Sequence, residues 1–163
     1  MPRLILTAVL VLALWGCGSD SGEKYLEEGF VYFQQQDFDR AIASYEKAIS
    51  LGARSPGAYN MLGMAYRFKY QRVKDPGLQE MEIEAFQQAV KIDPKYWVAM
   101  VNLGNTYYSR GDKERAAYWF KKALELNANH PEKAQMEKMI AEGTPPPENV
   151  QKKGRSSERR RGN

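Results

Sequence analysis

The sequence offers few side chains that could act chemically on a substrate. It contains one cysteine, Cys17, and one histidine, His130, so an intramolecular disulfide and a structural zinc site are both excluded. His130 lies in a linker with no serine or cysteine partner, and we interpret it as solvent-exposed or helix-capping rather than as a general base. The carboxylates of Glu80, Glu82 and Glu84 are interpreted as a solvated helix surface. P-loop and nucleophile-elbow motifs are absent, so we predict no enzyme activity, catalytic residue, metal or cofactor.

Cys17 ends a short apolar stretch near the N-terminus. Arg3 is followed by residues 4–15, which are apolar except for one threonine. A membrane-spanning helix needs roughly 20 apolar residues, so this segment has the length of a signal-peptide core instead. The sequence Leu-Trp-Gly-Cys that ends at Cys17 resembles the bacterial lipobox, with Trp15 where that motif usually has a small residue. A buried core cysteine is the alternative interpretation.

The lipobox resemblance implies a location. It implies that a signal peptide, residues 1–16, is removed and that Cys17 carries acyl chains such as palmitate, which give stable anchoring when two or three are present. Residues 17–22 then form a lipidated tether. In Gram-negative sorting, Asp directly after the cysteine tends to retain a lipoprotein in the inner membrane, and Gly18 occupies that position here. The implied location is the outer membrane of a bacterial envelope, facing the periplasm.

An internal repeat organises the rest of the chain. Three glycines, each followed three positions later by tyrosine, are separated by 34 and 41 residues, and 41 is one period of 34 plus an insertion of seven. The glycines are Gly29, Gly63 and Gly104. Each is followed by Ala-x-x-x-aromatic-x-x-Ala, except that Glu82 replaces the first alanine of the second copy. This pattern resembles the tetratricopeptide repeat. The resemblance implies an all-α, right-handed solenoid of three helix-turn-helix repeats plus a C-terminal capping helix.

The repeats divide the chain into segments. The tetratricopeptide domain is expected at residues 23–142, and the insertion near residues 69–78 is expected to lengthen either both helices of repeat two or the second alone. The dipeptide Asp75-Pro76 predicts the start of the second helix of that repeat. A capping helix is expected from Pro131 to about Glu142, with a buried side formed by Ala134, Met136, Ile140 and Ala141. Residues 143–163 are predicted to be a disordered basic tail.

The resemblance also implies a binding surface, because in this family the first helices of the repeats line a concave face. The matching positions here are Leu26, Phe30, Phe33, Asn60, Met64, Arg67, Phe68, Val98, Val101, Asn105 and Tyr108. Asn60 and Asn105 would hydrogen-bond the backbone of an extended peptide, aromatic rings and Met64 would contact its apolar side chains, and Arg67 would bind a carboxylate. Alternatively, apolar members such as Phe30 and Val101 merely pack between helices.

One function of the family is excluded by sequence. Chaperone-binding tetratricopeptide domains bind a C-terminal carboxylate with conserved Lys, Asn and Arg positions, and the matching positions here are Leu26, Phe30, Met61, Val98 and Asn102. The carboxylate clamp is therefore missing.

The distribution of charge along the chain bears on two hypotheses about function. Residues 144–163 contain six basic and two acidic residues, and without this tail and Arg3 the chain is close to neutral. The charge distribution therefore does not support a basic groove for nucleic acid in the folded part. The favoured hypothesis is an envelope-anchored adaptor that binds a peptide or partner protein in pilus, secretion or outer-membrane assembly, with self-association as a further possibility. The alternative is a spacer whose basic tail binds anionic lipid, lipopolysaccharide or nucleic acid.

Overall fold

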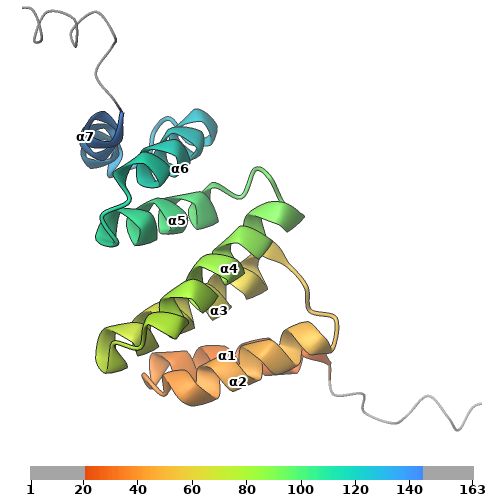
Figure 1. Ribbon diagram of the computed structural model, residues 1–163. Coiled ribbons are helices and arrows are strands. Elements are labelled where there is room, and N and C mark those ends of the chain that lie inside the picture. The colour runs from red at the N-terminus through yellow and green to blue at the C-terminus, as the bar shows by residue number, and fades with distance from the viewer. Residues whose placement is uncertain (1–20, 145–163) are drawn as a thin grey trace, which may run out of the picture.

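The computed structural model describes residues 21–144, and over that range the chain forms seven α-helices. They are α1 (Gly22–Gln34), α2 (Phe38–Ser50), α3 (Pro56–Val73), α4 (Pro76–Ile92), α5 (Trp97–Ser109), α6 (Lys113–Leu126) and α7 (Lys133–Gly143). Figure 1 shows them stacked in chain order, with the α1–α2 hairpin at one end and α7 at the other. The predicted all-α solenoid of three hairpins and a capping helix is confirmed. Cys17 and most of the predicted basic tail lie outside the described residues.

Short polar side chains start most of these helices. Ser21, Asp37, Ser55 and Asp112 each accept a hydrogen bond from a backbone N–H three residues later, in the first turn of α1, α2, α3 and α6. Such caps satisfy donors that have no partner within the helix. Asp75 accepts from the backbone N–H of Gly77 and precedes a proline in the first turn of α4. The predicted start of this helix is therefore confirmed.

The repeat glycines lie where the two helices of each hairpin cross. A Cβ atom added to Gly29 would lie 2.6 Å from the ring of Tyr45, and one added to Gly104 would lie 2.5 Å from the ring of Phe120. Gly63 faces the ring of Phe86 in the same way. All three rings are buried almost completely. Each aromatic ring therefore occupies the space that any larger residue at the glycine would need.

The seven-residue insertion lengthens both helices of the second hairpin. α3 has 18 residues and α4 has 17, whereas α1, α2 and α5 have 13 each. α1 and α5 end five residues after their repeat glycine, but α3 continues to Val73, ten residues after Gly63. The second hairpin consequently projects beyond its neighbours.

The buried side chains form two clusters that meet on α4. One cluster joins α2, α3 and α4 through residues such as Tyr45, Leu62 and Leu78. The other joins α4 with α5, α6 and α7, and it includes the fully buried ring of Phe120. α4 therefore supplies one wall to each half of the core.

The capping helix buries only part of the face that was predicted. Met136 is buried and Ile140 half-buried, but Ala134 and Ala141 are exposed. Gly143 lies directly against the backbone of Lys113 in α6, so the contact stripe runs along every third or fourth residue from Met136 to Gly143. The prediction that both alanines are buried was wrong, because they lie beside this stripe.

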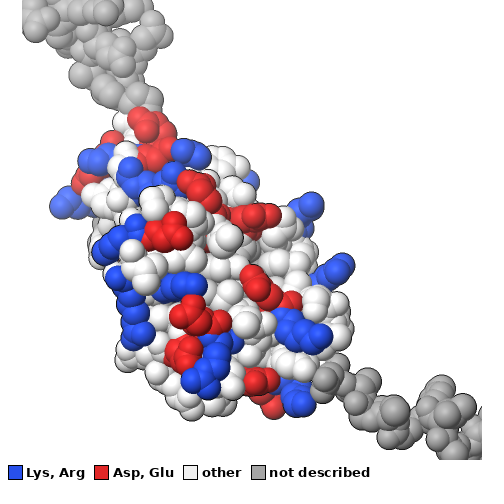
Figure 2. All heavy atoms as spheres, turned by 60° about the horizontal axis from the view of Figure 1, so that its bottom comes forward, with Lys and Arg blue, Asp and Glu red and all other residues white. Residues whose placement is uncertain are grey.

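The described surface carries mixed charge. Residues 21–144 contain equal numbers of acidic and basic side chains, and Figure 2 shows the two signs interspersed over one face. Within this range, none of the helices has the length and hydropathy that crossing a membrane would require.

We predict that Gly104→Ala lowers the free energy of unfolding by about 1–3 kcal/mol, because the added methyl group collides with the buried ring of Phe120. The control is Gly57→Ala in the first turn of α3, where a Cβ would come no closer than 3.8 Å to any neighbour. Urea unfolding measures both variants. Equal stability of the two would contradict the close helix approach at Gly104.

Candidate functional site

The first helices of the three hairpins carry hollows on one connected surface, which we call the groove face. Between α1 and α3 lies an apolar pocket of about 110 Å³, lined by Phe30, Phe33, Tyr45, Met61 and Met64. Between α3, α4 and α5 lies a polar pocket of about 290 Å³, lined by Arg67, Tyr70, Gln71, Gln79, Glu82, Asn105, Thr106 and Ser109. A third hollow shares Phe33 with the apolar pocket and Gln71 with the polar pocket. The three hollows therefore adjoin one another.

The structure brings several predicted binding residues together. Phe30, Phe33 and Met64 line the apolar pocket, and 47% of the Phe30 surface is exposed. Asn105 is exposed at the polar pocket. Val101, in contrast, packs half-buried against the core, as the alternative interpretation expects.

Tyr108 is directed to the capping helix. Its hydroxyl donates to Oε2 of Glu142 at 3.0 Å, and Lys113 Nζ donates to the same oxygen at 2.9 Å. The hydrogen bond to Glu142 raises the pKa of Tyr108, whereas the hydrogen bonds from Lys113 and then Tyr108 lower the pKa of Glu142. The lowered pKa means that the contact stabilises the folded chain at neutral pH and that this contribution is lost as the pH falls through the folded pKa of Glu142.

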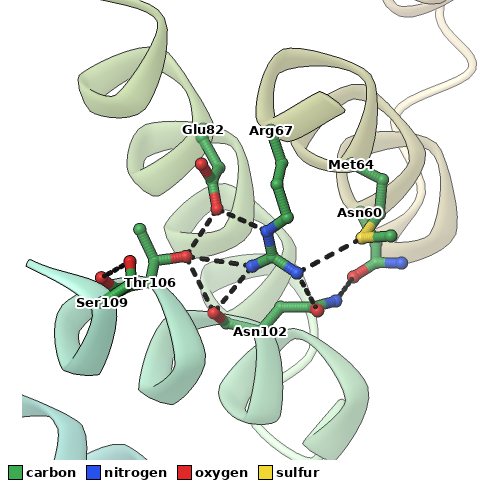
Figure 3. A network of polar contacts seen from close by, with 7 residues as sticks. All are labelled: Asn60, Met64, Arg67, Glu82, Asn102, Thr106 and Ser109. Carbon is green, nitrogen blue, oxygen red and sulfur yellow. Dashed lines mark hydrogen bonds and ion pairs between the residues drawn. The ribbon is translucent and has the colours of Figure 1, made fainter. Parts of the chain in front are cut away.

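A polar network joins the second and third repeats beneath the groove face (Figure 3). Arg67 is its centre, and its Nε donates to Oε1 of Glu82 at 2.7 Å. Its Nη1 donates to the side-chain oxygen of Asn102 at 2.8 Å. Its Nη2 donates to the backbone oxygen of Asn102 and to Oγ1 of Thr106, both at 2.9 Å. Thr106 in turn donates to Glu82 Oε1. The guanidinium also lies 4.9 Å from the ring centre of Phe86. The network therefore connects α3, α4 and α5.

The interpretation of Glu82 as a solvated surface residue was wrong. Its side chain is only 2% exposed, and it occupies the position that Ala41 and Ala116 occupy in the other repeats. Burial of a carboxylate is tolerated here because Arg67 and Thr106 supply a charge and two hydrogen bonds. The departure from alanine was the one signal in the sequence for this network.

The network changes what two predicted residues offer to a partner. The guanidinium of Arg67, which was expected to bind a carboxylate, has its donors engaged within the domain. Asn60 accepts a hydrogen bond from Nδ2 of Asn102 at 2.9 Å, while its own amide group donates to none of the residues from 21 to 144. Asn102 and Thr106 were not among the predicted site residues, because neither departs from a recognisable repeat pattern.

The remaining candidates for chemistry have structural roles. His130 Nδ1 accepts from the backbone N–H of Glu132 at 3.1 Å, and its ring lies 5.4 Å from that of Trp97, edge to face. These contacts hold His130 half-buried in the turn before α7, whose first turn receives no side-chain cap, so the residue is neither exposed nor helix-capping. In the described part of the chain, no three side chains of His, Cys, Asp or Glu are grouped so as to hold a metal ion.

We predict that Arg67→Met lowers the free energy of unfolding by about 3–5 kcal/mol, because it leaves Glu82 buried without its cation. The double variant Arg67→Met/Glu82→Leu removes both charges and should recover most of that loss. Urea unfolding of the wild type, both single variants and the double variant completes the cycle that measures the coupling. A double variant no more stable than Arg67→Met would mean that the ion pair is not what Arg67 contributes.

Comparisons with known proteins agree with this architecture. A family model described as a TPR repeat matches residues 29–67, and one described as regulator of microtubule dynamics protein 1-3 matches residues 79–143. Small glutamine-rich tetratricopeptide repeat-containing protein 2 of Mycosarcoma maydis is 29% identical over 108 residues, which are 66% of this chain and 29% of that protein. The chain thus spans less than a third of that relative's length.

Two solved structures are similar in fold. The first tetratricopeptide domain of Spaghetti (RPAP3), bound to an HSP90 peptide, has a TM-score of 0.65 at 23% identity and covers 76% of this chain and 93% of that one. The Yersinia enterocolitica type III secretion chaperone SycD, in complex with a peptide of the translocator YopD, has a TM-score of 0.64 at 18% identity and covers 76% and 92%. Together with the stacked hairpins and their glycine–ring contacts, these matches show that the chain has the tetratricopeptide-repeat fold.

Proposed function

We propose that this protein is an adaptor that binds an extended segment of a partner protein along the groove face. The proposal rests on two hollows of different character that the third hollow connects. One is apolar and lined by Phe30 and Met64, and the other is polar and lined by Asn105 and Gln79. An extended peptide presents apolar side chains and backbone amide groups together. The apolar pocket accepts the former, and the exposed amides of the polar pocket hydrogen-bond the latter.

The similar structures support this proposal. Both the Spaghetti domain and SycD are described with a bound peptide. The partner of the present protein should differ in chemistry from an HSP90 peptide, because Leu26, Phe30 and Val98 stand at positions where carboxylate-binding domains carry polar residues. The groove face should therefore select apolar side chains rather than a terminal carboxylate.

We further propose that the adaptor is anchored in the bacterial envelope through Cys17, at the outer membrane and facing the periplasm. The support is the apolar stretch of residues 4–15 and its lipobox-like end. Anchoring would concentrate the groove face at the membrane surface, where it could serve pilus, secretion or outer-membrane assembly.

The groove proposal is tested by crosslinking in the native membrane. A photoreactive residue replaces Phe30 in the apolar pocket, and a control replaces Tyr118, which is exposed on the second helix of the third hairpin. We expect a partner band from position 30 only, and mass spectrometry of the crosslinked peptide identifies the bound segment. Equal crosslinking from both positions would place the interaction elsewhere.

With that segment synthesised as a peptide, we predict that Asn105→Ala weakens its binding by about 1 kcal/mol for each amide hydrogen bond lost, without a change in urea unfolding. Asn105 is exposed, so its truncation removes little from the core. Asn129→Ala, also exposed but in the linker before α7, is the control and should bind normally. Undiminished binding by the Asn105 variant would mean that the polar pocket does not contact the peptide.

We predict that Cys17→Ser moves the protein from the membrane fraction to the soluble fraction, because serine offers no thiol for acylation. Fractionation and intact-mass measurement check this, and wild type should show the loss of residues 1–16 and the gain of acyl groups. Retention of the variant in the membrane, together with an uncleaved wild type, would exclude the lipoprotein proposal.

A further inference from the structure

The projecting end of α3 lines a hollow beside the turn of the first hairpin. Residues 69–73 continue α3 beyond the point at which α1 and α5 end. Gln71 and Arg72 in this extension face the turn between α1 and α2 and enclose a hollow of about 430 Å³, which we call the hairpin pocket. It exists because of the insertion in repeat two.

Three phenylalanine rings form the apolar part of the hairpin pocket. Phe33 and Phe68 are half-buried and lie with ring centres 5.5 Å apart, edge to face. Phe38 is buried beneath them, 5.6 Å from each. The exposed parts of Phe33 and Phe68 leave room for a further ring to pack against the cluster, in the offset or edge-to-face geometry that aromatic rings prefer.

Arg72 places a positive charge at the edge of this pocket. Its guanidinium donates to the backbone oxygen and to Oε1 of Gln36, at 2.9 and 2.7 Å, and lies 4.6 Å from the ring centre of Phe38. Both hydrogen-bond acceptors are neutral. Within residues 21–144, no carboxylate pairs with Arg72.

The nearby carboxylates already have cations. Asp37 pairs with Arg40 at 2.7 Å, and Asp39 pairs with Lys69 at 2.6 Å. The positive charge of Arg72 therefore has no carboxylate partner within residues 21–144. The guanidinium packs against the ring of Phe38, at the side of the aromatic cluster. This combination is complementary to an aromatic ring with a carboxylate next to it.

We propose that the hairpin pocket binds a partner segment in which an aromatic side chain adjoins Asp or Glu. The ring packs against Phe33 and Phe68, and the carboxylate accepts hydrogen bonds from Arg72. This inference refines the proposed function, on which it rests, because the pocket adjoins both other hollows of the groove face through Phe33 and Gln71. A peptide that follows the groove face would pass over it.

The test uses dipeptides that are too short to span the groove. Acetyl-Phe-Asp-amide is titrated into the isotope-labelled full chain and followed by two-dimensional NMR. We expect shifts of the side-chain amides of Gln36 and Gln71. Acetyl-Phe-Asn-amide keeps the shape but removes the charge, and it should bind about fivefold more weakly, as for the loss of one exposed ion pair. Acetyl-Ala-Asp-amide lacks the ring and should bind more weakly still.

Variants of Arg72 test whether its charge is responsible for the preference for Asp. Arg72→Gln should abolish the preference for Asp over Asn, and Arg72→Lys should retain part of it because the charge remains. Lys74→Gln removes a positive charge just past the end of the same helix but does not line the pocket, so the preference should persist. Wild-type spectra, compared with those of each variant, report whether the fold is unchanged.

Each other outcome overturns the proposal. Equal binding of the Asp and Asn dipeptides, loss of preference in Lys74→Gln, or the absence of shifts at Gln36 and Gln71 would each do so. Shifts confined to residues around Phe30 and Asn105 would also overturn it while leaving the peptide-binding groove intact. The crosslinking at Phe30 and the effect of Asn105→Ala test the groove itself, so the two failures are distinguishable.

Discussion

The contact between a glycine in the first helix and an aromatic ring in the second determines how each hairpin is built. The ring of Tyr45, Phe86 or Phe120 lies where a Cβ atom on Gly29, Gly63 or Gly104 would otherwise be. The two helices can then approach closely, and a large buried ring fills the crossing point. Because this contact secures one side of α1, α3 and α5, their opposite sides remain available to form the groove face.

This contact also explains how the chain accommodates its insertion. The glycine and the ring are 16 residues apart in the first and third repeats and 23 apart in the second. α3 continues five residues further past its glycine than α1 and α5 do, and α4 begins ten residues before its ring, where α2 and α6 begin seven before theirs. The extra residues therefore lie at the far end of the hairpin, beyond the crossing point. The insertion therefore leaves the crossing point unchanged and contributes new surface only beyond it.

The sequence was sufficient to predict the parts of the fold that depend on local pattern. The hairpins were predictable from the glycine spacing, from Asp75-Pro76 and from the Ala-x-x-x-aromatic-x-x-Ala pattern. The last two signals act within one or two helical turns. The role of Glu82 was not predictable in this way. Its partners Arg67 and Thr106 come from two other helices, and a carboxylate on an amphipathic helix is usually solvated. The contact of Gly143 in α7 with Lys113 in α6 was missed for a related reason, although Met136 and Ile140 were predicted on the buried side.

The candidate site was predictable in position but only partly in chemistry. Family positions indicated Phe30, Met64 and Asn105, and the structure places all three at hollows. They did not indicate that Arg67 is engaged by Glu82, that Tyr108 bonds Glu142, or that Arg72 lies beside a cluster of rings. Those outcomes depend on which side chains from neighbouring repeats reach the same point, and such long-range pairings leave no periodic signal in one sequence.

The position of α4 between the two apolar clusters has a consequence for how the domain opens. In a linear array whose clusters were separate, each repeat could melt by itself and the chain would lose structure in steps. Here α4 contributes to both clusters, with Leu78 and Ala85 in one and Ile83, Phe86 and Ala89 in the other. Undocking of α4 would expose both at once, so the midsection behaves as a single cooperative unit in hydrogen exchange, and only α1 and α7 can fray independently.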